Sequence, residues 1–311
     1  SVLAAILDAV RAIRCDEGAL FLAGGVESMS RAPYVLGKAD SAYARNQPLY
    51  DTVIGSRFPN PWITKEYGSH SMPETADNVA HDLSISRDAA DAYAARSQAR
   101  YAEALAKGFY KEELLTVEVA QGRKQPPRLV EEDEHPRPGS DVEKLGRLPA
   151  LFENGVVSAG NASGLNDGAA AMIVGSLAAG EKAGMAPRGR ILSGAIAGVP
   201  PRVMGLGPVP SSQKALARAG LSLDQMDLIE INEAFAVQVL GCVNQLGMSP
   251  EDSRLNPNGG AIAIGHPLGA SGARLALTAL RQLEATGGRY ALVTMCIGVG
   301  QGIAAVIERC E

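Results

Sequence analysis

Apolar residues recur at three- and four-residue spacing near the N-terminus, which predicts a helix over residues 2–13. A short apolar run at 19–23 then predicts a strand that enters Gly24 and Gly25. From residue 189 onward, apolar runs alternate with amphipathic segments. They predict strands at 191–197, 226–231, 290–296 and 302–307, and helices at 211–219, 232–246 and 269–285. This alternation indicates an α/β layered architecture.

The pattern fades between residues 31 and 154, where Pro, Tyr, His and charged residues increase. One helix is predicted to begin near Met72, and another to follow Ser86 as its N-cap and to continue to about Lys107. Residues 131–138 form a charged, proline-bearing loop. We interpret this region as an inserted lid. Residues 157–177 return to small apolar residues and predict a turn followed by a helix or a strand.

The chain has 311 residues, enough for two domains with their own cores. Its net charge of −5 argues against nucleic acid or an anionic membrane as the main partner, although a local basic patch for a phosphorylated ligand stays open. The cysteines are widely spaced, which disfavours a metal site or a disulfide framework and predicts a reducing, cytoplasmic location. They are Cys15, Cys242, Cys296 and Cys310.

Two glycine-rich segments carry the residues with the clearest chemical potential. His266 lies in the segment 256–274, and Cys296 opens the turn Cys-Ile-Gly-Val-Gly-Gln-Gly. Backbone N–H groups at a strand end are expected to lower the pKa of Cys296 toward neutrality, and histidine is the usual general base. The alternatives are a histidine that stabilises a turn and an inert buried cysteine. A dinucleotide loop is disfavoured, because the spacing is GxGxG and a strand follows.

Asn232 lies where a predicted strand meets a predicted helix. It has two possible roles: its side chain can cap the helix N-terminus, or its amide can hold a water or an oxyanion. The remaining histidines and cysteines are interpreted as solvated, capping or structural: His70, His81, His135, Cys15, Cys242 and Cys310.

Five segments together resemble the thiolases, or acyl-CoA acetyltransferases. They are GGVESMSR at 24–31, AGNASGLNDGA at 159–169, NEAFA at 232–236, the Gly-His266-Pro turn and the Cys296 turn. The resemblance implies two βαβαβαββ halves stacked in αβαβα layers, with a lid inserted in an incomplete first half. The expected divisions are 1–35 for the rest of the N-terminal half, 36–155 for the lid, 156–186 for the end of that half, and 187–311 for the C-terminal half.

The resemblance also implies roles for individual residues. His266 corresponds to the histidine that activates the nucleophile, and Cys296 to the second cysteine, which moves protons at the α-carbon of acetyl-CoA. Asn232 corresponds to the residue that, through a water, builds an oxyanion hole with His266, and the Gly298 N–H to a donor of the second hole. The residues expected to contact substrate or CoA are Ser163, Met72, Met204, Phe235 and Ala159. Ser71 stands where many biosynthetic thiolases have a histidine.

The lid segments narrow the resemblance to 3-oxoadipyl-CoA thiolases, which cleave that substrate with CoA to succinyl-CoA and acetyl-CoA in aromatic-compound breakdown. They are 31–42, 51–58, 67–68, 71–76 and 133–138. The substrate ends in a carboxylate, so a lid cation is expected to bind it. The candidates are Arg31, Lys38, Arg57 and Lys65. The resemblance implies coenzyme A as a substrate, no metal or other cofactor, and a homo-oligomer, either a dimer or a tetramer.

The nucleophilic cysteine of thiolases precedes the helix that corresponds to residues 2–13. Ser1 falls at or just after that position, and Cys15 is at the opposite end of the helix, where the dipole disfavours a thiolate. We therefore expect a chain that lacks the nucleophile, performs no thiolysis alone and is poorly stable. Two alternatives stay open: an acetoacetyl-CoA or general 3-ketoacyl-CoA thiolase, and a non-catalytic CoA- or lipid-binding protein of the same fold.

Overall fold

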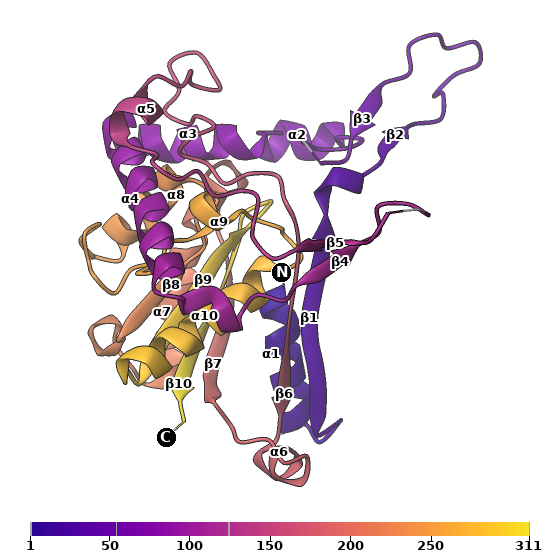
Figure 1. The fold of residues 1–311 in the computed structure, drawn as a ribbon. Helices are drawn as coiled ribbons and strands as arrows, with labels where there is room; N and C mark the ends of the chain where they lie inside the picture. Colours follow the sequence, from indigo (N-terminus) through magenta and orange to yellow (C-terminus); the bar gives the residue numbers. More distant parts are fainter. Residues whose placement is uncertain (1, 54, 124, 311) are drawn as a thin grey trace.

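A four-stranded sheet forms the centre of the protein in the computed structural model, which describes residues 2–53, 55–123 and 125–310 (Figure 1). Ser1 lies outside these residues. The strand order is β7 (Gly189–Gly198), β10 (Gln301–Arg309), β9 (Tyr290–Ile297) and β8 (Leu228–Ile231). β8 is parallel to β9, and the other neighbours are antiparallel. The strands predicted in this half of the chain are therefore present, with slightly different ends.

Helices cover both faces of this sheet. α7 (Pro208–Ala219) and α8 (Ala236–Gln245) pack with Leu292 and Val306 on one face. α1 (Val2–Arg14) and α10 (Ser271–Thr286) pack with Val293 and Ile303 on the other. Burial on both faces explains why β9 is a continuous apolar run in the sequence and not an alternating one.

A second, two-stranded sheet lies beyond α1 and α10. It pairs β1 (Leu20–Ser28) with β6 (Asp167–Gly175), so residues 167–175 form a strand, and β1 extends five residues beyond its predicted end. Its inner side chains contact the helices. On its outer face Leu22 is 77% exposed and Val26 70% exposed. Within the described residues the layers are therefore α, β, α and β.

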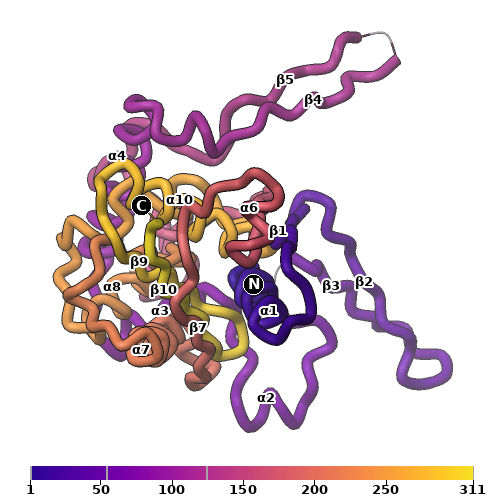
Figure 2. The backbone as a smooth tube through the Cα atoms, turned by 90° about the horizontal axis from the view of Figure 1, so that it is seen from below, coloured from indigo at the N-terminus to yellow at the C-terminus, as the bar shows by residue number. Residues whose placement is uncertain are grey.

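Residues 36–155 contain most of the irregular structure. The helices here are α2 (Pro61–Tyr67), α3 (Met72–Asp82), α4 (Arg87–Ala106) and α5 (Val142–Gly146). α3 and α4 contact α8, α4 also contacts α9 (Ala261–Ile264), and α5 packs on α4. Two hairpins, β2 (Tyr34–Leu36) with β3 (Leu49–Asp51) and β4 (Val117–Val119) with β5 (Arg128–Val130), extend away from the body (Figures 1 and 2). The Ser86 side chain accepts from the N–H of Ala89 at 3.2 Å, which confirms the predicted N-cap.

Several predicted boundaries are wrong. The helix predicted to start at Asn232 starts at Ala236, because the N–H of Asn232 still bonds the carbonyl of Thr294 as in the sheet. Asn232 is therefore not an N-cap. α7 begins three residues before its predicted start, and the short helix α9 in the glycine-rich segment was not predicted. None of the helices in the described ranges has the length and apolar composition needed to cross a membrane.

Candidate active site

His266 is fixed by hydrogen bonds at its backbone and at both ring nitrogens. Gly265 adopts φ +106°, and a Cβ there would lie 2.6 Å from the side chain of Asn166, whose Oδ1 accepts from the N–H of His266 at 3.0 Å. Nδ1 lies 2.7 Å from Ser271 Oγ, and Ser271 Oγ donates to the Pro267 carbonyl at 2.9 Å. Since the hydroxyl has one proton, it accepts from Nδ1–H. Nε2 therefore keeps its lone pair.

The Nε2 lone pair faces Asn232 Nδ2 at 3.2 Å. Both residues are buried. Burial lowers the pKa of His266 to about 4, and the positive charge of Arg274 lowers it further. The ring is consequently neutral at pH 7. A neutral, oriented imidazole with an unprotonated Nε2 is the form that a general base needs.

Asn232 has an unsatisfied acceptor. The residue is completely buried at the end of β8, and its Oδ1 has no hydrogen-bond partner among the residues that the structure describes. Buried amide oxygens are normally paired, and ordered water satisfies many of them. The arrangement therefore suits a water held beside the His266 ring.

Glu233, the next residue, was not predicted to have a role. Its buried carboxylate joins β8 to α4 and to the segment that leads to His266. It accepts from Tyr93 Oη at 2.8 Å, Ser97 Oγ at 2.6 Å, Asn256 Nδ2 at 3.0 Å and the N–H of Ile262 at 3.1 Å. Burial raises the pKa of Tyr93 well above its usual value, and the Glu233 carboxylate adds to this rise. The sequence signal for this network is a charged residue two positions after a buried strand.

Cys296 lies near the end of β9, opposite Gly302 of β10. The turn that follows contains two residues with positive φ, Val299 and Gly300. The expectation that the pKa of Cys296 is lowered is wrong: burial raises it to about 12. The thiol belongs to the apolar cluster that contains Met204 and Phe235, and this environment disfavours the thiolate.

The predicted substrate-contacting residues are distributed around this cluster. Met72 is 41% exposed, and its Sδ lies 3.9 Å from the position that a Cβ at Gly298 would take. Ser163 donates to the Ala234 carbonyl through both N–H and Oγ, at 3.0 and 3.1 Å, which places it beside Phe235. Ala159 is exposed in a turn four residues earlier.

His70 and His81 are exposed, as predicted, but His135 is half-buried. The His135 ring lies over Gly164, where a Cβ would come within 2.4 Å of the ring atom Cε1. Burial lowers the pKa of His135, and the nearby Arg137 lowers it further. The lid loop therefore reaches the segment that contains Ser163.

The candidate carboxylate-binding cations are all exposed: Arg31, Lys38, Arg57 and Lys65. Arg57 donates to the Thr52 carbonyl at 2.8 Å. Cys15 is exposed just after the last turn of α1. Among residues 2–53, 55–123 and 125–310, no cluster of three His, Cys, Asp or Glu side chains has the geometry to bind a metal. Two surface hollows, one between α1 and β7 and one beside Arg254 and Gln282, include neither His266 nor Cys296.

Comparisons with known proteins identify the family of this chain. The thiolase N-terminal and C-terminal domain models match residues 1–178 and 185–309. A beta-ketoadipyl-CoA thiolase from Pseudomonas aeruginosa is 57% identical over 306 residues, which cover 98% of this chain and 76% of the relative. A 3-oxoadipyl-CoA/3-oxo-5,6-dehydrosuberyl-CoA thiolase from Escherichia coli K12 is 55% identical, covering 97% of this chain and 75% of the relative.

A solved structure supports the same assignment. Human mitochondrial 3-ketoacyl-CoA thiolase in complex with CoA superposes with a TM-score of 0.90 at 39% identity, covering all of this chain and 76% of the human one. The predicted family, the α/β thiolase fold and the assignment as an acyltransferase enzyme are thus confirmed. The chain belongs to the thiolase family.

Proposed function

We propose that this chain acts in the thiolytic cleavage of 3-oxoadipyl-CoA by CoA, which gives succinyl-CoA and acetyl-CoA in aromatic-compound degradation. The names of the bacterial relatives at 55% and 57% identity support this substrate. The CoA bound to the human relative supports CoA as a substrate. We propose that the chain needs no metal or other cofactor.

The observation that carries the proposed chemistry is the neutral His266 ring, with Nε2 at 3.2 Å from Asn232 and an unpartnered Asn232 Oδ1 beside it among the described residues. His266 would accept a proton at Nε2 when a thiol nucleophile is activated. The resulting imidazolium would then donate from Nε2 to the thioester oxygen, with a water on Asn232 Oδ1 as the second donor.

Cys296 would serve as the second acid–base group. In the condensing direction its thiolate takes a proton from the α-carbon of acetyl-CoA, which leaves an enolate and a neutral thiol. In the cleaving direction the thiol returns that proton to the carbanion. The burial that raises the pKa of Cys296 keeps the thiol protonated at neutral pH, which is the form that the cleaving direction needs. The N–H of Gly298 would bind the acyl-enzyme oxyanion.

We propose that Met72, Met204, Phe235, Ser163 and Ala159 line the path of the pantetheine chain. The proximity of Met72 to Gly298 and the shared cluster of Met204, Phe235 and Cys296 support this path. Residues 36–155 would form the lid, between the N-terminal segments 1–35 and 156–186, with 187–311 as the C-terminal half. One of Arg31, Lys38, Arg57 and Lys65 would bind the terminal carboxylate.

We also propose a cytoplasmic homo-oligomer, a dimer or a tetramer. The free cysteines support a reducing compartment. The exposed apolar side chains on β1 and on the β2–β3 hairpin support self-association, since soluble monomers seldom expose large apolar patches. They include Leu22, Val26, Leu36 and Leu49.

A binding experiment tests the substrate without requiring turnover. Calorimetry would compare 3-oxoadipyl-CoA with 3-oxohexanoyl-CoA, which has the same six-carbon acyl chain but no carboxylate, and with acetoacetyl-CoA. A charge-assisted contact predicts at least about tenfold tighter binding of 3-oxoadipyl-CoA. Equal affinities for the two six-carbon ligands would contradict carboxylate recognition, and preference for acetoacetyl-CoA would favour a short-chain thiolase.

A further inference from the structure

Strand β8 and helix α10 are connected at two levels. At the first level, Asn232, directly after β8, and Ser271 of α10 face the two ring nitrogens of His266. At the second level, Glu230 lies two residues before Asn232 and Arg274 three residues after Ser271. Residues two apart share one face of a strand, and residues three apart share one face of a helix. Both levels therefore join the same face of β8 to the same face of α10.

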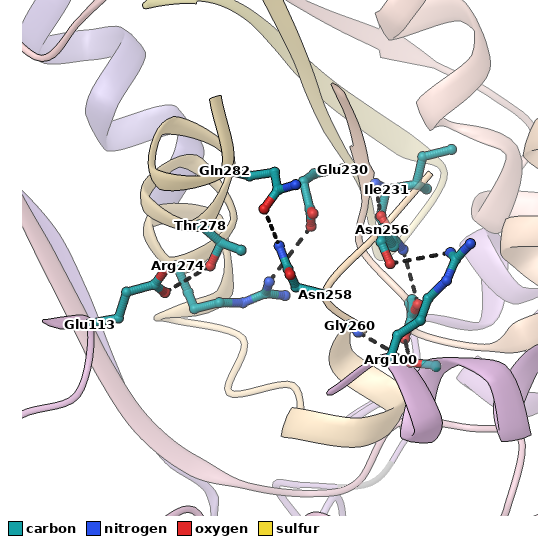
Figure 3. Close-up of polar contacts among 12 residues, drawn as sticks. Arg100, Glu113, Glu230, Ile231, Asn256, Asn258, Gly260, Arg274, Thr278 and Gln282 are labelled. Atoms are coloured by element: carbon teal, nitrogen blue, oxygen red, sulfur yellow. Dashed lines mark hydrogen bonds and ion pairs between the residues drawn. The ribbon is translucent and has the colours of Figure 1, made fainter. Parts of the chain in front are cut away.

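The second level is a buried carboxyl–guanidinium pair. Figure 3 shows Arg274 extending from α10 toward Glu230, with a dashed line between them. Arg274 Nη1 lies 3.8 Å from Glu230 Oε2. Glu230 is 0% exposed, and the Arg274 side chain is 17% exposed. The pair is therefore almost completely shielded from bulk water.

The carboxyl and guanidinium groups are close but are not directly hydrogen-bonded. Among the described residues, neither oxygen of the Glu230 carboxylate and neither Nη of Arg274 has a hydrogen-bond partner. Burial raises the pKa of Glu230 to about 8; Arg274 and Arg100 oppose this rise, and Glu233 and Glu113 add to it. Unsatisfied buried polar groups are costly, and ordered water commonly bridges such groups.

A buried pair of this kind is weak evidence for stability, because desolvation can exceed the Coulombic gain. Its position suggests another role. We propose that Glu230 and Arg274 form a water-bridged positioning pair that fixes β8 against α10 and thereby holds the His266 ring between Asn232 and Ser271. The inference rests on the proposed role of His266 as the base.

The pair acts on His266 through geometry and charge. Loss of the bridge lets β8 and α10 separate, which lengthens the contact between Asn232 Nδ2 and His266 Nε2. Arg274 also contributes a positive charge that disfavours protonation of the ring, in addition to the larger effect of burial. Removing that charge therefore raises the pKa of His266.

Histidine NMR tests the pair directly, because the protein has only four histidines and His266→Asn identifies the relevant signals. Arg274→Gln is expected to raise the pKa of His266 by about one unit. Arg274→Lys keeps the charge and should restore most of that shift. Glu230→Gln should move the Nε2 resonance, because the contact with Asn232 changes. If Arg274→Gln does not fold, Arg274→Lys and Glu230→Gln still report the Nε2 environment.

Arg281→Gln is the matched control. Arg281 lies on α10 seven residues after Arg274, about 10 Å along the helix axis. Its Nη1 lies 2.7 Å from Glu112 Oε2. The proposal is overturned if Glu230→Gln and both Arg274 variants leave the His266 signals and pKa as they are in Arg281→Gln.

This experiment separates the pair from the proposed function. The NMR titration needs no substrate, whereas binding of acyl-CoA and proton exchange from acetyl-CoA report the function. If the wild type neither binds acyl-CoA nor exchanges the protons of acetyl-CoA, but the variants still shift the His266 signals, the proposed function is refuted and the positioning pair is supported. If the wild type exchanges the protons of acetyl-CoA but these variants leave His266 unchanged, the pair alone is refuted.

Discussion

The carboxylate of Glu233 occupies the space that a side chain at Gly260 would need: a Cβ at position 260 would lie 2.3 Å from Glu233 Cδ. Gly260 is the N-cap of α9, and its N–H donates to Ser97 Oγ, which in turn donates to Glu233. The glycine therefore allows the lid helix α4, the end of β8 and the segment before His266 to meet in one network.

This contact predicts that Gly260→Ala lowers the free energy of unfolding by about 2 kcal/mol, because the methyl group must displace a hydrogen-bonded carboxylate. Chemical denaturation followed by circular dichroism measures the change. Gly146→Ala is the control, since a Cβ there meets nothing within 4 Å. Equal stabilities of the two variants would show that the network tolerates the added carbon.

The cysteines should differ strongly in reactivity. Cys15 is exposed, whereas burial raises the pKa of both Cys242 and Cys296. Because the thiolate is the reacting species, iodoacetamide at pH 7.5 should label Cys15 first and leave Cys242 and Cys296 unlabelled in the folded protein. Peptide mapping by mass spectrometry measures the order, with urea-unfolded protein as the control. Rapid native labelling of Cys296 would contradict its apolar environment.

Glu230 should make stability depend on pH. Its pKa is raised to about 8 in the folded protein and is near 4.5 when unfolded. The unfolded state therefore releases its proton first, and this contribution to stability is lost as pH rises from about 4.5 to 8, by at most about 1.4 kcal/mol per pH unit. The stability of the wild type relative to Glu230→Gln should fall over that range.

Denaturation curves at several pH values measure this difference. Glu284→Gln is a control of opposite sign, because the ion pair with Arg188 lowers the pKa of Glu284. The contribution of Glu284 to stability should be constant near neutral pH and should be lost only as pH falls through the acid range. A wild-type advantage over Glu230→Gln that grows with pH would mean that Arg274 keeps Glu230 ionised throughout.

The outer face of β1 should govern self-association. Leu22→Glu places a charge on a side chain that is 77% exposed in the isolated chain, so it should leave the fold intact and weaken any assembly that covers this face. Sedimentation velocity over a concentration series measures the effect. Leu177→Glu, on the exposed surface of α6 (Leu177–Lys182), is the matched control. Unchanged association of Leu22→Glu would exclude β1 from the interface.

The sequence predicted the features that depend on local spacing. Ser86 caps α4, and the apolar runs of β9 and β10 lie in the sheet as expected. The sequence does not show how far the hydrogen bonding of β8 continues, so it predicts the start of α8 at Asn232, four residues before the observed start at Ala236. Nor could it give the burial of Cys296, which reverses the direction of its pKa shift.

The candidate site was predicted through motifs, and its supporting residues were not. Glu230 and Glu233 flank Asn232 in the sequence, but their partners come from positions between 23 and 140 residues away. No local pattern specifies such contacts. The detectable signal is the presence of two acidic residues in and just after a buried strand, since carboxylates are seldom fully buried without a partner.

The most direct test of the account is deuterium exchange at the methyl group of acetyl-CoA, followed by proton NMR in D₂O. This step needs Cys296 and the oxyanion donors but no acyl-enzyme nucleophile. The account predicts exchange above the buffer rate that rises with pH, persists in Cys15→Ser and falls by about 10²–10³ in Cys296→Ala and Asn232→Ala. Exchange at the buffer rate, or exchange unchanged by Cys296→Ala, would contradict it.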